Sequence, residues 1–495
     1  MLRRTMYIIG YKSSYMAQLS PDLLLPSQGV KRSNLLAQRF GHSAKYPRVP
    51  TNLSPVEMFS RIQGRCEYSY LLESENSSNR LAEFSFIGFD PVAIFTAAGG
   101  SVEIRDRTGK VEKRRSRDPL LDLRRTLEGR SLVDTSFRFA GGGVGYVSYD
   151  AVRYWERLPD SRKDPAIFPD LEFAIFDDGL VFSHEEGETY YYTLSEDRLE
   201  DVLEMIGEER PLPKLKVSPP KRNLGRAEYE GSVRRTKKYI RAGDIFQAVI
   251  SKKFLFTIDG SLLPFYSVLR RINPSPYMYY LAFGEREVVG SSPEMLLRVE
   301  GRTVETFPIA GTRPRSNDVR KNQKLRKELL TDPKEKAEHL MLVDLARNDV
   351  GKVAKYGTVK TTDFMSIMEF SHVQHIVSRV VGELQDGSDS FDAFRAVFPA
   401  GTVSGAPKPR AMEIIDELEP RRRGPYAGAV GYFSYNGNAD FAIAIRTLFR
   451  RGRVGYLQAG AGIVADSVPS KEWLETEAKA RVLLEALRNY SGGES

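Results

Sequence analysis

Three apolar segments near the C-terminus constrain the fold of this 495-residue chain more than any other feature. They are AGAVGYFSY (427–435), FAIAIRTLF (441–449) and YLQAGAGIV (456–464), and the turn Asn436-Gly437-Asn438 separates the first two. Alternating apolar residues beside a short Asn-Gly turn predict antiparallel strands. Because helical patterns precede and follow these segments, we expect an α+β fold in which antiparallel sheets carry flanking helices.

The chain is too long for one hydrophobic core, and a proline-rich segment divides it. Residues 209–224 contain four prolines and several lysines, so we interpret them as a linker. This division predicts a smaller N-terminal α+β domain over residues 51–208 and a larger domain over residues 225–490. Residues 1–50 hold a single acid, Asp22. They can be a transit peptide, a poorly ordered arm or the product of an upstream start codon.

Composition and charge exclude several classes of protein. No apolar run reaches the roughly 18 residues of a membrane span, and the single cysteine, Cys66, excludes a disulfide framework or a cysteine-built metal cluster. The formal net charge of +8 permits a nucleic-acid partner, but the basic residues are dispersed and no nucleic-acid-binding motif is present. We interpret the charge as a solvated basic surface that helps attract anionic substrates. We expect a cytoplasmic protein with no nucleic-acid or membrane partner.

Two predicted helices each place a pair of acids on an apolar face. In the helix Asp332–Asp349, the residues Glu335 and Glu338 share a stripe with Leu342 and Leu345. Carboxylates on a buried face need a cation or a hydrogen-bond donor, because an unpaired buried charge is costly.

The second helix lies near the C-terminus and repeats this pattern. Glu472 and Glu475 share a stripe with Lys479 and Leu483. Carboxylate oxygens, with water and substrate completing the coordination, suit Mg²⁺. The alternative is that these acids form surface ion pairs with residues on neighbouring turns.

Several segments are suited to binding an anion. Arg446 stands alone in an apolar run, where an arginine usually needs a carboxylate partner from the protein or from a ligand. The glycine-rich segment 458–462 leaves backbone amides open to an anion, and residues 401–408 precede a predicted helix N-terminus. In Pro308–Arg313, Gly311 permits close backbone approach. These residues predict a pocket for a small carboxylate-bearing substrate bound together with Mg²⁺.

Seven motifs in order resemble those of the chorismate-utilising enzymes and, within that family, those of component I of anthranilate synthase. The resemblance extends over about residues 53–488 and implies a large chorismate-binding domain with a smaller N-terminal domain. The motifs are GSSPEMLLR (290–298), PIAGTRPR (308–315), EHLMLVDLARND (338–349), AGTVSGAPK (400–408), GAVGYF (428–433), AIAIR (442–446) and QAGAG (458–462).

The resemblance implies that ammonia attacks C2 of chorismate, the C4 hydroxyl leaves, and elimination of pyruvate yields anthranilate. This is the first committed step of L-tryptophan biosynthesis. Glu294 resembles the general acid for the leaving hydroxyl, and His375 and Thr402 resemble the other catalytic residues. The residues implied for chorismate binding are Gly311, Thr312, Tyr426, Arg446, Gly460, Ala461 and Gly462.

The resemblance also implies a metal ion. Mg²⁺ would bind the ring carboxylate of chorismate and act as a Lewis acid. Glu338 and Glu475 would hold the ion directly, and Glu335 and Glu472 would support it.

Two positions separate the relatives within this family. Members that add water carry a lysine base where this chain has Gln247. Aminodeoxychorismate synthases usually carry a nucleophilic lysine where this chain has Ala310. The resemblance therefore favours anthranilate synthase, with component I of aminodeoxychorismate synthase as the alternative.

The N-terminal part carries a resemblance to a regulatory site. Residues 71–74 (LLES) and 273–278 (NPSPYM) resemble the two walls of the L-tryptophan pocket in feedback-inhibited enzymes. The alternative is an ordinary strand end and proline turn. The residues implied to contact L-tryptophan are Ser74, Pro276, Tyr277 and Met278.

No glutamine amidotransferase domain is recognisable, because a nucleophile-elbow cysteine is absent and Cys66 lies in the wrong context. The resemblance therefore implies a separate amidotransferase subunit, component II, that supplies ammonia from glutamine. It also implies a heterotetramer of two large and two small subunits.

Overall fold

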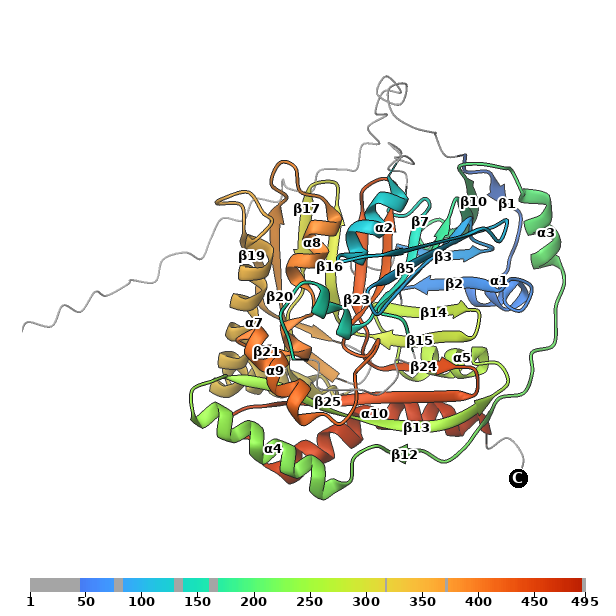
Figure 1. Ribbon diagram of the computed structural model, residues 1–495. Helices are drawn as coiled ribbons and strands as arrows, with labels where there is room; N and C mark the ends of the chain where they lie inside the picture. The colour runs from blue at the N-terminus through green and yellow to red at the C-terminus, as the bar shows by residue number, and fades with distance from the viewer. Residues whose placement is uncertain are drawn as a thin grey trace, which may run out of the picture.

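The structure, a computed structural model, consists of two large antiparallel sheets with helices packed against them (Figure 1). The α+β class predicted from the alternating segments, with antiparallel sheets and flanking helices, is confirmed. No helix in the described part of the chain is long and apolar enough to cross a membrane. The described residues are 45–74, 83–128, 137–159, 168–316, 318–369 and 373–491.

Sheet 1 is built from both ends of the chain. In spatial order it comprises β1 (Arg48–Val49), β10 (Glu188–Thr193), β9 (Asp178–Ser183), β3 (Phe84–Phe89), β2 (Tyr68–Glu73), β14 (Tyr277–Phe283), β15 (Arg286–Ser292), β24 (Thr447–Arg451), β25 (Val454–Ile463), β13 (Gln247–Asp259) and β11 (Lys216–Val217). The strands β12 (Lys221–Arg222) and β21 (Gly405–Ala406) also pair with β13.

Sheet 2 has the same mixed origin. Its order is β18 (Ile309–Pro314), β20 (Val373–Glu383), β17 (Thr303–Thr306), β16 (Met295–Glu300), β23 (Ala439–Ile443), β22 (Ala429–Ser434), β7 (Gly142–Val147), β8 (Leu171–Phe176), β4 (Ala93–Ala98), β5 (Ser101–Asp106) and β6 (Val111–Arg115). The strand β19 (Lys360–Glu369) pairs with β20.

Each sheet is continuous across the two predicted domains. In sheet 1, β2 pairs with β14 and places Tyr70 opposite Leu281. In sheet 2, β7 pairs with β22 and places Val144 opposite Tyr432. The proline-rich segment 209–224 contributes β11 and β12, both paired with β13. The portions 51–208 and 225–490 thus share both sheets, and the domain boundaries themselves stay a prediction.

The helices cover the sheets through three buried clusters. One set packs on sheet 1: α1 (Pro55–Ile62), α3 (Leu199–Gly207), α5 (Leu263–Ile272) and α10 (Pro469–Ser491). A second set packs around β13 and β25: α4 (Arg226–Arg241) and α9 (Lys408–Leu418). A third set packs against sheet 2: α2 (Pro119–Leu127), α6 (Val319–Thr331), α7 (Pro333–Gly351) and α8 (Ser390–Val397). Two short 3₁₀ helices are η1 (Tyr149–Tyr154) and η2 (Gly401–Val403).

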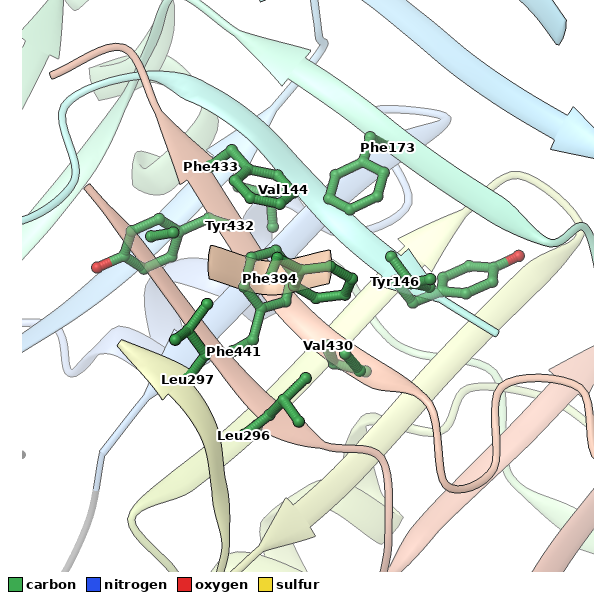
Figure 2. Close-up of a cluster of buried hydrophobic side chains, with 14 of the residues drawn as sticks. Val144, Tyr146, Phe173, Leu296, Leu297, Phe394, Val430, Tyr432, Phe433 and Phe441 are labelled. Carbon is green, nitrogen blue, oxygen red and sulfur yellow. The ribbon is translucent and has the colours of Figure 1, made fainter. Parts of the chain in front are cut away.

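The core against sheet 2 is rich in phenylalanine. Phe394 of α8 lies over Phe441 of β23, with ring centroids 4.8 Å apart (Figure 2). Phe433 of β22 lies 4.7 Å from Phe441, and Phe173 of β8 lies 5.9 Å from Phe433. These rings join helix α8 to strands from both halves of the chain, and their packing contributes more than buried area alone.

The helix α7 begins where the sequence predicts. The side chain of Asp332 accepts hydrogen bonds from the backbone amides of Lys334 and Glu335, and Pro333 occupies the first helical turn, where its missing N–H costs nothing. This cap fixes the start of the helix. It therefore also fixes the direction in which Glu335 and Glu338 project.

One buried ion pair joins the two sheets. Glu172 of β8 in sheet 2 is fully buried and accepts two hydrogen bonds of 2.7 Å from Arg286 of β15 in sheet 1. The hydroxyl of Tyr146 donates to the same carboxylate at 2.7 Å, and that of Tyr68 at 3.3 Å. Four donors thus surround a carboxylate that has no contact with solvent, which is the condition under which a buried ion pair is tolerated.

We expect Arg286→Met to destabilise the protein strongly, because it leaves the charge of Glu172 buried without a cation. The expected loss is about 3–5 kcal/mol in the free energy of unfolding, measured by urea denaturation. The double variant Glu172→Gln/Arg286→Met should recover much of that loss. A loss below about 1 kcal/mol for the single variant would show that the pair is not needed to hold the sheets together.

Candidate functional site

A cavity of about 680 Å³ lies where the two sheets meet α7 and α10. Sheet 1 contributes the ends of β13 and β25, and sheet 2 contributes β18 and β20. Residues more than 200 positions apart in the sequence therefore face the same space. The predicted site residues that line it are Gly311, Thr312, Glu335, Glu338, His375, Thr402, Arg446, Gly462, Glu472 and Glu475.

Four of the residues predicted for catalysis or chorismate binding do not line this cavity. Glu294 borders a smaller neighbouring cavity of about 40 Å³, which shares Thr402 with the large one. Tyr426 is buried, and its hydroxyl lies 2.9 Å from the position that a Cβ on Gly460 would occupy. Ala461 is buried in the cluster beneath α4 and α9. Tyr426, Gly460 and Ala461 therefore shape the wall from behind in this structure.

Arg446 is a cation without a carboxylate partner. Its guanidinium faces the cavity, and desolvation by the surrounding protein lowers the pKa of Arg446. No carboxylate among the described residues forms an ion pair with it, and its Nη1 donates to Oδ1 of Asn273 at 3.1 Å. The predicted single strand 441–449 is corrected by the structure. It divides into β23 and β24, and Arg446 lies between them with a φ of 50°.

The acids of α7 and α10 face each other across the cavity. Burial raises the pKa of Glu338, and the charges of Glu335 and Glu475 raise it further. Burial likewise raises the pKa of Glu472, and the nearby charge of Glu475 adds to the effect. Carboxylates from two helices thus repel one another, and a cation placed between them would relieve this repulsion.

Lysines and an arginine partly neutralise these acids. Lys479 lies 2.8 Å from Glu475, Lys334 lies 3.7 Å from Glu338, and Arg313 lies 3.0 Å from Glu335. Within the described ranges, no three His, Cys, Asp or Glu side chains are gathered closely enough to hold a metal ion. The oxygen donors nevertheless fit a hard cation such as Mg²⁺ in chemistry. A bound ion would draw these side chains together and compete with the lysines.

Arg313 of the PIAGTR segment does not line the cavity. It pairs with Asp332 at 2.9 Å and with Glu335 at 3.0 Å. The guanidinium of Arg313 therefore donates to carboxylates of the protein. Gly311 in the same segment has a φ of 66°, and a Cβ there would lie 2.9 Å from Oε2 of Glu335. This backbone conformation favours glycine, because a side chain there would be strained and would displace the neighbouring side chains.

His375 is held as a neutral imidazole. Burial lowers the pKa of His375 to about 4. Its Nδ1 lies 2.7 Å from the carbonyl oxygen of Gly311 and 3.1 Å from the hydroxyl of Thr312. Because a carbonyl can only accept, the Nδ1 position carries the proton. The ring is therefore oriented by the same turn that contributes Gly311 and Thr312 to the cavity.

Glu294 has the properties of a general acid. Burial raises the pKa of Glu294 to about 7, although Thr402 and Lys479 act in the opposite direction. A carboxyl with that pKa is substantially protonated near neutral pH and can donate a proton. The hydroxyl of Thr402 lies beside it, is buried, and makes no hydrogen bond of normal geometry. It is thus available to a ligand at the boundary between the two cavities.

The two positions that separate the relatives both face the large cavity. Gln247, at the start of β13, and Ala310, in β18, line it. Neither can serve as the lysine that some family members place at these positions. The nucleophile for any reaction here must therefore come from outside these two positions.

A third cavity, of about 60 Å³ and called the small cavity from here on, gathers the residues predicted to bind the inhibitor. Ser74, at the end of β2, faces Pro276, Tyr277 and Met278 across it. The hydroxyl of Ser74 is buried and makes no hydrogen bond of normal geometry. The segment 273–278 lines both cavities, because Asn273, Pro274 and Ser275 face the large one.

Sequence reasoning missed some residues of the two cavities. Asn273 holds Arg446, and it was recognised only as part of the NPSPYM wall. Lys334 and Ser467 line the large cavity, and Arg298 and Asp440 line the small one. A single polar residue at such a position carries no signal of its own in the sequence, so only the arrangement in space identifies these residues.

Comparison with known proteins agrees with this geometry. A family model described as chorismate binding enzyme matches residues 67–485. The chain belongs to this family of chorismate-binding enzymes. It is 51% identical over 433 residues to anthranilate synthase component 1 of Methanothermobacter marburgensis, covering 88% of this chain and 92% of the relative. It is 44% identical to the Saccharolobus solfataricus protein of the same name, covering 88% and 97%.

Solved structures give the same result. Anthranilate synthase component I from Streptococcus pneumoniae is 35% identical, with a TM-score of 0.73, covering 89% of this chain and 99% of that one. The isochorismate synthase MenF from Escherichia coli, at 19% identity and a TM-score of 0.68, shares the fold. The predicted resemblance to anthranilate synthase component I, and the prediction of an enzyme of this type, are confirmed.

The raised pKa of Glu294 predicts a pH-dependent stability difference. The folded carboxyl has a pKa of about 7 and the unfolded one has the ordinary value of 4.5. The contribution of this carboxyl to the free energy of unfolding is therefore fully present below pH 4.5 and is lost as the pH rises to about 7. Because Glu294→Gln stays neutral, we expect it to be more stable than the wild type at pH 8, by about 3 kcal/mol.

Thermal unfolding of both proteins between pH 5 and pH 8 would measure this difference. The exposed Glu204 provides a control, since Glu204→Gln should give no difference that grows with pH. If the difference in stability between Glu294→Gln and the wild type were constant between pH 5 and pH 8, the carboxyl of Glu294 would not be protonated in the folded protein.

Proposed function

We propose that this protein is the chorismate-converting subunit of an anthranilate synthase. It would convert chorismate and ammonia to anthranilate and pyruvate, as the first committed step of L-tryptophan biosynthesis. The observation that supports this most is the large cavity, in which Arg446 has no carboxylate partner from the described part of the chain and faces a space shared with four glutamates. A cavity with a free cation on one side and clustered acids on the other suits a carboxylate substrate bound with a divalent metal.

The metal would be held by the acids of the two helices. Glu338 of α7 and Glu475 of α10 are the proposed ligands of Mg²⁺, and Glu335 and Glu472 would support them. When bound, the ion would neutralise a carboxylate of chorismate and polarise the ring. Arg446 would bind the second carboxylate, and the desolvation of its half-buried guanidinium would strengthen that interaction.

Proton transfer is assigned to Glu294. Its carboxyl would protonate the C4 hydroxyl of chorismate, which would leave as water. Thr402 would contact the substrate through its hydroxyl, and neutral His375 would border the ring without adding charge. Gly311 and Thr312, at the irregularity in the pairing of β18, would contact the substrate.

Free ammonia is the proposed nucleophile. Gln247 cannot deprotonate water as a lysine does, and Ala310 cannot form a covalent adduct with C2. Ammonia would be supplied by a separate amidotransferase that hydrolyses glutamine, in a heterotetramer of two large and two small subunits in the cytoplasm.

The reaction itself provides the first test. Purified protein is incubated with chorismate, MgCl₂ and an ammonium salt at mildly alkaline pH, and anthranilate is followed by its fluorescence. We expect anthranilate and pyruvate in equal amounts. A non-aromatic aminodeoxychorismate product would instead indicate the folate-branch alternative, and no product at all would contradict the proposed function.

The metal assignment predicts the behaviour of Glu338→Ala. We expect this variant to fold normally and to lose more than about 100-fold in Mg²⁺-dependent turnover, because a ligand of the ion is removed. A Mg²⁺ titration of turnover, with thermal unfolding as the control for folding, measures both effects. Turnover near that of the wild type at every Mg²⁺ concentration would exclude Glu338 as a ligand.

L-Tryptophan is the proposed feedback inhibitor, bound in the small cavity beside Ser74. Replacing Ser74 by leucine would fill part of a space of about 60 Å³. We expect Ser74→Leu to raise the half-inhibitory concentration of L-tryptophan at least about tenfold, with the chorismate KM unchanged. If the wild type were not inhibited, the regulatory proposal would fail. If the variant were inhibited equally, the inhibitor would bind elsewhere.

A further inference from the structure

Arg446, Asn273 and Ser291 form a closed set of hydrogen bonds at the wall of the large cavity. Nδ2 of Asn273 donates to Oγ of Ser291 at 2.6 Å, and Nη1 of Arg446 donates to Oδ1 of Asn273 at 3.1 Å. The backbone amide of Ser291 donates to the carbonyl oxygen of Arg446 at 3.2 Å. The same β15 residue therefore holds both the backbone of Arg446 and the amide that orients its side chain.

The network determines which way the amide of Asn273 points. The guanidinium of Arg446 can only donate, so it must face the amide oxygen. The amide nitrogen then faces the Ser291 hydroxyl, which accepts. Asn273 is 8% exposed and caps the C-terminus of α5, and Ser291 is fully buried, so neither side chain has room to rearrange.

The choice of a neutral partner has an electrostatic consequence. The buried arginines Arg298 and Arg423 have carboxylate partners, Asp440 and Glu419 respectively. Arg446 has an amide instead, which orients the guanidinium through a hydrogen bond and leaves its charge uncompensated. Because the group is held away from bulk water, that charge attracts an incoming anion strongly.

We propose that Asn273 is a positioning residue for the substrate. It fixes the guanidinium of Arg446 toward the cavity and, because it is neutral, keeps the full positive charge available for a substrate carboxylate. The inference rests on the proposed function, since it takes that carboxylate to belong to chorismate. The role of Asn273 is to prepare Arg446, and no contact between Asn273 and the substrate is required.

Aspartate separates this role from a merely structural one. Asn273→Asp keeps the shape and an acceptor for both Arg446 and the Ser291 hydroxyl, so a structural role would be preserved. It also adds a negative charge within hydrogen-bond distance of Arg446, which would compete with the substrate carboxylate. Asn273→Ala tests the other half of the role, because it removes the hydrogen bond that orients Arg446 but adds no negative charge beside it.

The experiment measures chorismate KM and kcat with an ammonium salt and Mg²⁺, and chorismate affinity by calorimetry. We expect Asn273→Asp to raise the KM and the Kd at least about tenfold, and to change kcat less than about threefold. Asn273→Ala should raise the KM by a smaller factor. Asn223 provides a matched control, because it is half-buried outside both cavities and Asn223→Asp should leave KM and Kd unchanged.

The comparison of the KM and Kd values of Asn273→Asp with those of Asn273→Ala decides whether Asn273 has this role. A KM and Kd for Asn273→Asp that are equal to the wild-type values, or closer to them than those of Asn273→Ala, would overturn it, with thermal unfolding showing that all variants are folded. A wild-type protein that neither binds chorismate nor makes anthranilate would overturn the proposed function, and the ligand named here with it. Wild-type activity combined with the wrong order would overturn this inference alone.

Discussion

The relative placement of the two sheets is the constraint on which the rest of the molecule depends. The large cavity has walls from β13 and β25 of one sheet and from β18 and β20 of the other. The buried carboxylate of Glu172 spans the two sheets and is saturated by Arg286, Tyr146 and Tyr68. Any sliding of one sheet over the other would break these bonds in a dry environment, where an unpaired charge is most costly. The same contact therefore stabilises the fold and holds the walls of the cavity in register.

The cavity is organised by charge. Arg446 has no carboxylate partner among the described residues, and burial together with the nearby charge of Glu475 raises the pKa values of Glu338 and Glu472. Such an arrangement is unfavourable in the free protein, and a ligand that brings carboxylates together with a divalent cation would relieve it. A protein that keeps uncompensated charge facing a cavity gives up stability for binding, which is typical of functional sites. Glu294, with a pKa of about 7, is a further example.

The segment 273–278 connects the two cavities through the backbone. Its first residue holds Arg446, and its last three residues line the small cavity beside Ser74. If L-tryptophan occupies that small cavity, it contacts the end of the same six-residue segment whose first residue, Asn273, orients Arg446 in the large cavity. The two sites are therefore connected by one continuous stretch of backbone. A conformational change in this segment would alter the binding of both ligands.

Local patterns carried much of the sequence-based prediction. The alternation around Asn436-Gly437-Asn438 predicted antiparallel strands, and the stripe that Glu335 and Glu338 share with Leu342 and Leu345 predicted the helix α7. The stripes of Glu335 with Glu338 and of Glu472 with Glu475 indicated that these acids face inward. Each of these signals depends on residues within a few turns of one another, so a linear sequence can carry it.

The tertiary structure decided everything that depends on pairing over long separations. That β2 pairs with β14, and β7 with β22, makes both sheets continuous across the proline-rich segment 209–224. The sequence indicated that Arg446 needs an anion, but not that its nearest partner is the neutral amide of Asn273, 173 residues away. A hydrogen bond between distant positions leaves no periodic trace in either segment. By itself the sequence determined the α+β class, the acidic stripe of α7 and the residue types of the site, whereas the packing of the two sheets decided where the strand 441–449 divides and which of those groups meet.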